Sequence, residues 1–414
     1  MAETRKLTIS ITALFRALAN RNNSIFVLLS IIIVLLIADT SISRATSVVV
    51  ERISDVRFAT FVLIGIIPGV MQYFILKFVK RQSIGIRTAR KLDFIVIHRI
   101  TEFSQYLLAS IFLFVVLQMI FFSFYSTAAL TLATVISYIL AGIMMGVLAN
   151  KFFGWFRSYR NSVVFLYGLS SGMITINLVV TGLFVTEILQ DQPTVVSSLH
   201  LKNIPFITPN SIADLLDYPY VVSSILSFIL AWIATAWLLR HYSHNLGTKT
   251  FWVMLCLPLV FFLLQFGSLF TDLLSPFFRT QPIFFGTLYT LFFASSKPVG
   301  GIFFGIAFWT LAQKVRNNIV IRNYLLLSAY GFMLLFVSNQ AIVLTFNFYP
   351  PFGLPSVCFI GLSSYLLMIG IYSSATSLSQ DIKLRQSIRR SAKKELEFLD
   401  RIGMAYMEQQ LEKR

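Results

Sequence analysis

The chain contains 414 residues, of which 57% are apolar and only 12% are charged, against roughly 25% charged in an average soluble protein. This composition, with a mean hydropathy of +0.77, predicts a polytopic membrane protein and excludes intrinsic disorder, collagen and a secreted disulfide scaffold. The net charge of +17, from 34 Lys and Arg against 17 Asp and Glu, is compatible with nucleic-acid binding, an acidic partner or membrane topology.

Ten segments contain the roughly 20 apolar residues that a helix needs to cross a hydrocarbon core about 30 Å thick. They are residues 24–43, 58–79, 103–125, 127–149, 163–189, 220–239, 251–273, 283–312, 324–348 and 355–377. The first is predicted to be a retained anchor, because the polar stretch before it is long for a signal peptide and no clean cleavage site follows. The predicted fold class is all-α: a transmembrane bundle of about ten spans (24–377), a basic N-terminal segment (1–23) and a tail (378–414).

The basic residues set the predicted orientation, because Lys and Arg are retained on the cytoplasmic side of a membrane. With the N-terminus inside, 28 of the 34 cations lie on the inner side and six outside, so the net charge is +19 inside and −2 outside. Both chain ends are therefore predicted to be cytoplasmic, in the cell (cytoplasmic) membrane. The same distribution argues against a nucleic-acid partner, because topology alone accounts for each basic piece.

Two segments outside the predicted spans have distinctive compositions. The outer loop 190–218 contains three prolines among Ser, Thr and Asn, and it is either a ligand loop or a solvated linker. The inner segment 80–102 interleaves cations with apolar residues, which predicts a segment lying on the membrane surface.

The tail 378–414 is predicted to be an amphipathic helix that continues the last span. Its apolar stripe has helical spacing and consists of Ile388, Ala392, Leu396, Leu399, Ile402 and Tyr406. From residue 383 to 394 there are six cations and no acid, which suits anionic lipid headgroups: Lys383, Arg385, Arg389, Arg390, Lys393 and Lys394. Acidic residues then mix into the helix, which favours a helical protein partner; the alternative is a helix resting on the protein's own inner face.

Two stretches of this tail carry a resemblance. Residues 377–391 read SLSQDIKLRQSIRRS, and residues 402–408 read IGMAYME. Together they resemble the end of a group of uncharacterised archaeal multi-spanning membrane proteins. The resemblance covers about the last quarter of the chain, and it implies no particular activity.

The eighth predicted span is about ten residues longer than a straight crossing needs, and residues 295–301 (SSKPVGG) interrupt it. Proline removes an amide donor and glycine removes stiffening side chains, so this span is predicted to be broken or kinked. Broken helices mark binding sites in many transporters, which makes Lys297, Pro298, Gly300 and Gly301 candidates for binding an anionic ligand. The alternative is a crossing over 293–312, in which Lys297 extends to the headgroups.

The ninth span contains the densest polar cluster inside the predicted bilayer, Ser338, Asn339 and Gln340. Its depth is compatible with that of the break in the eighth span, so these three residues complete the predicted ligand site. Hydrogen bonds between helices are the alternative explanation.

Four pairs of glycines spaced four residues apart predict close packing between helices. These pairs are Gly65 and Gly69, Gly142 and Gly146, Gly168 and Gly172, and Gly301 and Gly305.

Enzyme signatures are missing from the sequence. It has no Walker loop, H-E-x-x-H or G-x-S-x-G motif, and the inner loops are too short for a catalytic domain. His241 and His244 have no nearby carboxylate to complete a metal site, and His98 stands alone. Cys256 and Cys358 lie in apolar runs and are predicted to be packing residues. We therefore expect no catalytic residues, cofactor or metal.

These observations favour a sensor or signal-coupling module, in which an outer cavity acts through the last span on the tail helix. Two alternatives remain: a transporter of a neutral or anionic small solute, and a scaffold subunit of a larger membrane complex. The absence of charged residues near the middle of any span argues against a proton relay.

Overall fold

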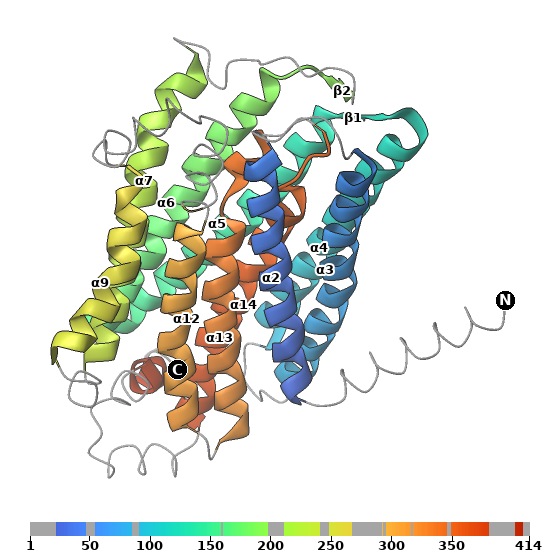
Figure 1. The fold of residues 1–414 in the computed structure, drawn as a ribbon. Helices are drawn as coiled ribbons and strands as arrows, with labels where there is room; N and C mark the ends of the chain where they lie inside the picture. Colours follow the sequence, from blue (N-terminus) through green and yellow to red (C-terminus); the bar gives the residue numbers. More distant parts are fainter. Residues whose placement is uncertain are drawn as a thin grey trace.

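The structure is a computed structural model that describes most of the chain. The described residues are 22–46, 54–84, 91–158, 160–197, 211–240, 248–266, 292, 295–315, 318–345, 349–380 and 402–408. Their elements are α2 (Asn22–Thr46), α3 (Ser54–Ile84), α4 (Lys91–Phe122), β1 (Phe124–Ser126), α5 (Thr127–Ser158), α6 (Ser162–Gln190), β2 (Val195–Ser197), α7 (Ile212–Leu239), α9 (Thr248–Leu264), α12 (Ser296–Lys314), α13 (Ile319–Ser338), the 3₁₀ helix η2 (Ala341–Thr345) and α14 (Leu354–Gln380). Figure 1 shows the helices bundled side by side, with the small β1–β2 sheet at one end.

Eight helices in the described part of the chain are long and apolar enough to cross a membrane. They are α2 to α7, α13 with η2, and α14. This confirms the all-α class and indicates a membrane-embedded protein. The eight match eight of the ten predicted spans, and the seventh and eighth predictions correspond to the shorter apolar helix α9 and to α12.

The outward faces of the bundle carry large apolar side chains. Phe103 is 70% exposed and Phe121 is 72% exposed, and both lie on α4. In water such a surface would be unfavourable, whereas lipid tails solvate it at no cost.

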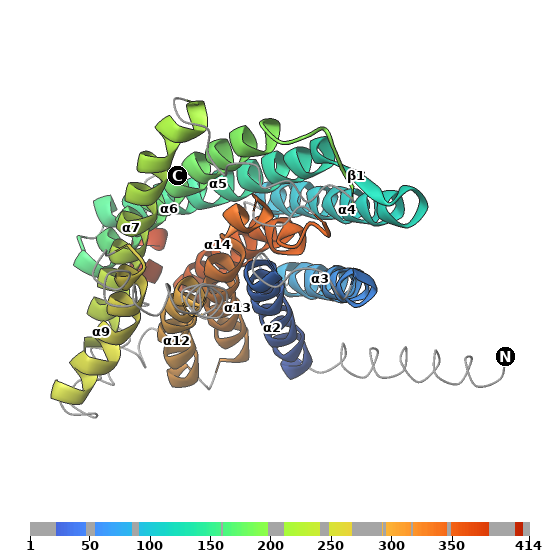
Figure 2. The same cartoon turned by 45° about the horizontal axis from the view of Figure 1, so that its top comes forward.

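Helix α14 lies at the centre of the bundle in Figure 2 and packs antiparallel to α13, which lies between α12 and α2. Residues 354–371 of α14 are all buried, and α14 contacts α13, α5, α4, α2 and α3. A Cβ atom added to Gly331 of α13 would lie 2.6 Å from the backbone nitrogen of Leu367 of α14. The two backbones approach this closely because glycine has no side chain.

The predicted glycine pairs differ in their roles. Cβ atoms added at Gly301 and Gly305 would clash with α13, so this pair sets the close approach of α12 to α13. Gly142 and Gly146 face α6 at ordinary contact distance. For Gly69 and Gly172 the prediction of close packing is wrong, because an added Cβ would meet no atom within 4 Å.

Local capping sets where several helices begin. Asn161 accepts hydrogen bonds from two amides at the start of α6, and Ser211 and Asn318 each accept one at the starts of α7 and α13. Side-chain oxygens of Asn and Ser satisfy amides that have no partner within the helix.

The sheet joins two connections at one end of the bundle. Tyr125 of β1 pairs with Val196 of β2, and the Oε1 atom of Gln118 accepts the N–H of Ser126. Burial raises the pKa of Tyr125, whose ring stacks on Tyr349 at 6.3 Å between centroids. The sheet therefore lies against the connection between α13 and α14.

Two predictions about connecting segments need correction. The loop predicted over 190–218 contains strand β2, and its last residues form the start of α7 at Ile212. The described parts of segment 80–102 continue α3 and α4 and do not form a separate surface helix. Residues 1–21 of the N-terminal segment lie outside the described residues.

Candidate functional site

The predicted break of the eighth span coincides with the first turn of α12. The helix begins at Ser296, and the amide of Val299 donates to the carbonyl of Ser295 at 2.9 Å. Pro298 is tolerated there because amides in a first turn need no acceptor within the helix. The preceding half of this predicted span, apart from Phe292, lies outside the described residues.

Lys297 points to α7. Its Nζ lies 5.6 Å from the ring centroid of Tyr220, which is within the range of a cation–π interaction. The Tyr220 ring in turn stacks on Phe184 of α6 at 4.9 Å. Behind the lysine, Gly300 leaves room for the ring of Phe228 from α7, and Pro298 is buried.

Asn339 is the centre of a buried hydrogen-bond chain that joins four helices. Tyr138 of α5 donates to Oδ1 of Asn339 at 3.1 Å. The Asn339 amide donates to Oδ1 of Asn177 of α6 at 2.9 Å, and the Asn177 amide donates to Oγ of Ser223 of α7 at 3.1 Å. Asn339 therefore makes hydrogen bonds to α5 and α6 from the end of α13.

The two predicted clusters meet through one turn of α7. The Oγ of Ser223, at the end of the asparagine chain, donates to the carbonyl of Tyr220, whose ring lies under Lys297. Ser338 and Gln340 are also buried beside Asn339. Ser338 Oγ has no hydrogen-bond partner among the described residues.

Asp39 is a buried polar residue of α2 that the sequence prediction did not select. Its carboxyl oxygens accept the amide of Gly353 at 3.0 Å and 3.1 Å, and the amide of Ser356 at 3.3 Å. The hydroxyl of Ser356 also donates to Asp39, at 2.7 Å. An oxygen acceptor from α2 thus caps the N-terminus of α14.

This cap completes the hydrogen bonds of the first turn of α14. The amide of Leu354 donates to Pro351, Pro355 has no amide hydrogen, and the amide of Val357 donates to Gly353. Gly353 has a φ of +94° and no side chain, so it cannot provide the capping oxygen itself. The two remaining amides, those of Gly353 and Ser356, donate to Asp39.

His98, predicted to stand alone, has partners. Its Nδ1 lies 2.6 Å from the hydroxyl of Tyr365 of α14, and its Nε2 lies 3.8 Å from Glu102, one turn further along α4. Glu102 also lies 4.0 Å from the Nζ of Lys80 on α3. A line of polar groups thus runs from the exposed Lys80 to the buried centre of α14.

The tail segment 402–408 packs against the far end of α14. The Tyr406 hydroxyl lies 3.3 Å from that of Tyr372, and the two rings meet edge to face at 5.7 Å. Ile402 and Tyr406, both in the predicted stripe, are buried. The six predicted lipid-facing cations, Lys383, Arg385, Arg389, Arg390, Lys393 and Lys394, lie outside the described residues.

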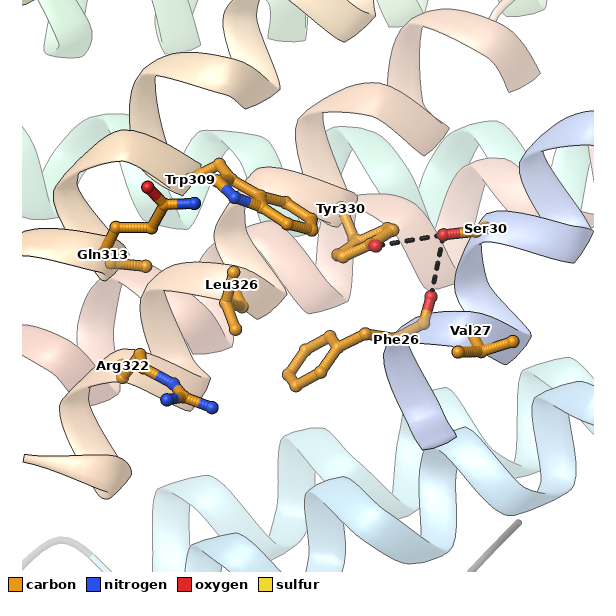
Figure 3. A pocket seen from close by; sticks show the side chains of 9 residues that line it. Phe26, Val27, Ser30, Trp309, Gln313, Arg322, Leu326 and Tyr330 are labelled. Carbon is orange, nitrogen blue, oxygen red and sulfur yellow. Dashed lines mark hydrogen bonds between the residues drawn. The ribbon is translucent and has the colours of Figure 1, made fainter. Parts of the chain in front are cut away.

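A separate cavity of about 650 Å³ lies between α2, α12 and α13 (Figure 3). Its lining includes Trp309, Arg322 and Tyr330 and none of the predicted ligand-binding residues. Along α12, Trp309 is twelve residues beyond Lys297, or about 18 Å at 1.5 Å per residue. The cavity and the predicted site are therefore at different levels of the bundle.

Among the described residues, no group of three or more His, Cys, Asp or Glu side chains could hold a metal ion. Cys256 and Cys358 are free thiols, and Cys358 is buried.

Comparisons with family models, with curated proteins and with solved structures find no match to this chain.

Proposed function

We propose that the protein is a non-enzymatic integral protein of the cytoplasmic membrane that couples its outer face to a cytoplasmic tail helix. In this proposal, the bundle has ten spans, with α9 and α12 among them, and the β1–β2 end faces outward. The distribution of Lys and Arg supports this orientation.

The observation that carries the proposal is that one buried helix, α14, has polar contacts at both ends. At the outer end, Asp39 holds its first turn through Gly353 and Ser356. At the inner end, Tyr372 contacts Tyr406 of the tail segment. A displacement of α14 at one end is therefore transmitted to the other through a single hydrogen-bonded helix.

Close packing favours a small, discrete movement of α14. Backbones that approach as closely as those at Gly331 and Gly370 leave no room for gradual rearrangement. Helices packed in this way shift by about 1–2 Å between alternative arrangements in known switches. A ligand at the polar cluster of Ser338, Asn339 and Gln340 would favour one arrangement of α14, and the position of the tail would change with it.

The test measures the position of the tail when the outer end is perturbed. Spin labels are attached at Arg157→Cys, on the exposed inner end of α5, and at Glu408→Cys, on the tail, in a Cys256→Ala/Cys358→Ala background. We expect Asp39→Asn to shift the distance between the labels by about 1–2 Å or to broaden its distribution.

Asp214→Asn is the matched control, because Asp214 is an exposed acid at the outer end of α7. Ser356→Ala is a milder change at the same cap and guards against general unfolding of the Asp39 variant. Identical distance distributions in the parent, Asp39→Asn and Ser356→Ala proteins would show that the tail does not respond to the outer cap.

A second candidate function is transport of a neutral or anionic small solute. The position of Lys297 beside the chain of Tyr220, Ser223, Asn177 and Asn339 favours it, because one cation and two side-chain amides lie close together there. Uptake into proteoliposomes that is unchanged by Lys297→Ala would exclude this site. Chains that co-purify in fixed ratio would instead favour a scaffold subunit.

A further inference from the structure

The cavity between α2, α12 and α13 has one wall made of apolar and aromatic side chains. This wall is formed by Phe26 and Val27 of α2, Leu326 and Tyr330 of α13, and Trp309 of α12 (Figure 3). The Phe26 and Tyr330 rings stack at 5.7 Å. At about 650 Å³, the cavity is within the range of about 300–1,000 Å³ that small-molecule sites occupy.

The two hydroxyl groups of this wall already have partners. The Ser30 hydroxyl donates to the carbonyl of Phe26 at 2.9 Å and lies 3.0 Å from the Tyr330 hydroxyl. A ligand along this wall therefore needs no hydrogen-bonding groups, and a hydrocarbon chain satisfies it.

The opposite end of the cavity is cationic. Arg322 of α13 extends its guanidinium into the space, as Figure 3 shows. The exposed Gln313 also lines the cavity, with its amide near Trp309. No acidic residue belongs to the described lining. The Nε of Arg322 is buried and has no hydrogen-bond partner among the described residues.

With no acid in the described lining, the guanidinium nitrogens that face the cavity favour binding of an anion. The planar guanidinium matches the oxygens of a phosphate group and can bind two of them at once. The cavity thus combines a site for an anionic group with a wall for a hydrocarbon chain.

We infer that this cavity binds an anionic phospholipid of the surrounding membrane. The phosphate contacts Arg322, and one acyl chain lies along Phe26, Val27 and Leu326. The cavity is at the end of the bundle where the basic residues gather and where anionic headgroups are attracted in cytoplasmic leaflets. A free phosphate would leave the apolar wall uncovered, so the chain and the headgroup together favour a lipid.

Native mass spectrometry of the full-length, delipidated protein tests this inference. The probes are phosphatidylglycerol and phosphatidylcholine with the same acyl chains, and glycerol 1-phosphate as a water-soluble phosphate. We expect phosphatidylglycerol to bind best and Arg322→Gln to weaken its binding about tenfold, as the loss of a charged hydrogen bond does. Arg157→Gln, which removes an exposed cation of α5 at the same end of the bundle, should leave binding unchanged.

A second variant tests the apolar wall without changing any charge. Val27→Trp fills the cavity at a residue that is 50% exposed, and we expect it to weaken phosphatidylglycerol binding. Val253→Trp is its control, at a residue that is 66% exposed on α9. If Arg322→Gln does not fold, the comparison of Val27→Trp with Val253→Trp tests the inference alone.

Three outcomes would overturn the inference. They are equal binding of the two lipids, phosphatidylglycerol binding that neither Arg322→Gln nor Val27→Trp weakens, and Arg322-dependent binding of glycerol 1-phosphate at least as tight as that of the lipid. The site is separate from the contacts of α14 with the tail, so its failure would leave the proposed coupling unaffected.

Discussion

The hydroxyl of Tyr365 lies 2.6 Å from the Nδ1 atom of His98, and this contact joins α4 to the buried centre of α14. The two residues are 267 positions apart in the chain. Each has a polar atom that lipid and apolar side chains cannot satisfy, so each depends on the other.

Tyr365→Phe should destabilise the protein by about 1–3 kcal/mol, because it leaves the buried Nδ1 of His98 without its partner. The double variant His98→Phe/Tyr365→Phe should lose less than the sum of the two single variants, since neither buried polar group then remains. Thermal unfolding in lipid nanodiscs measures both effects. Tyr218→Phe, at a tyrosine of α7 that is 76% exposed, is the control, and fully additive losses would contradict the pairing.

The cap at the start of α14 predicts a graded series. Ser356→Ala removes one donor to Asp39 and should cost about 1 kcal/mol, whereas Asp39→Ala leaves the amides of Gly353 and Ser356 without an acceptor and should cost more, about 1–3 kcal/mol. Denaturant unfolding in mixed micelles measures the series. Ser110→Ala, at an exposed helical serine, should change little. A smaller effect for Asp39→Ala than for Ser356→Ala would contradict the cap.

The close packing of α13 and α14 makes Gly370 intolerant of a side chain. A Cβ there would lie 2.6 Å from the backbone nitrogen of Ser328 and from the carbonyl oxygen of Tyr324. Gly370→Ala should therefore cost about 1–3 kcal/mol and lower the melting temperature by several degrees. Gly69→Ala should be neutral or stabilising by up to about 1 kcal/mol, because its Cβ meets nothing and alanine favours a helix. Equal melting temperatures for the two variants would contradict this packing.

The amide pair Asn177 and Asn339 should show a measurable coupling. A double-mutant cycle of Asn177→Ala and Asn339→Ala should give about 0.6 kcal/mol, and at most about 1.7 kcal/mol, as buried hydrogen bonds between membrane helices do. Unfolding in sodium dodecyl sulfate provides the free energies. The control cycle pairs Asn177→Ala with Ser110→Ala, for which the coupling should be zero. A coupling no larger than that of the control would show that this contact is not energetically significant.

The docking of the tail on α14 predicts a disulfide. A Cβ at Gly403 would lie 3.4 Å from the Cβ of Leu378, close to the separation of about 3.5–4.5 Å in disulfides. Leu378→Cys/Gly403→Cys, in the Cys256→Ala/Cys358→Ala background, should oxidise rapidly under mild oxidant. Leu378→Cys/Met404→Cys should oxidise more slowly, because Met404 is turned about 100° around the helix. Equal rates, measured by gel shift, would contradict the docking.

Composition and hydropathy are sufficient to predict the helices but not the contacts between them. Runs of apolar residues predicted the eight long spans, because the thickness of a bilayer imposes the length of each run. The same runs predict that Asn339 lies within a span but not that it contacts Asn177. They also give no reason to choose Asp39 as a structurally important residue. Its partner Gly353 is 314 residues away, and no local pattern encodes a contact at that distance.

The break predicted in the eighth span corresponds to the start of α12. Proline is incompatible with the middle of a regular helix, whereas Gly300 and Gly301 both lie within the regular helix α12. A proline in the first turn satisfies the same constraint, and in the described residues α12 begins two positions before it. The sequence motif alone does not distinguish a break from a start.

The most enclosed helix, α14, follows the other seven candidate spans in the chain. During synthesis those seven therefore enter the membrane before their common partner exists. The slot that α14 finally occupies must be filled by lipid or by an insertion factor until then. Assembly of the bundle thus ends with the displacement of that temporary occupant, and a nascent chain arrested before residue 354 should be the form most exposed to membrane quality-control proteases.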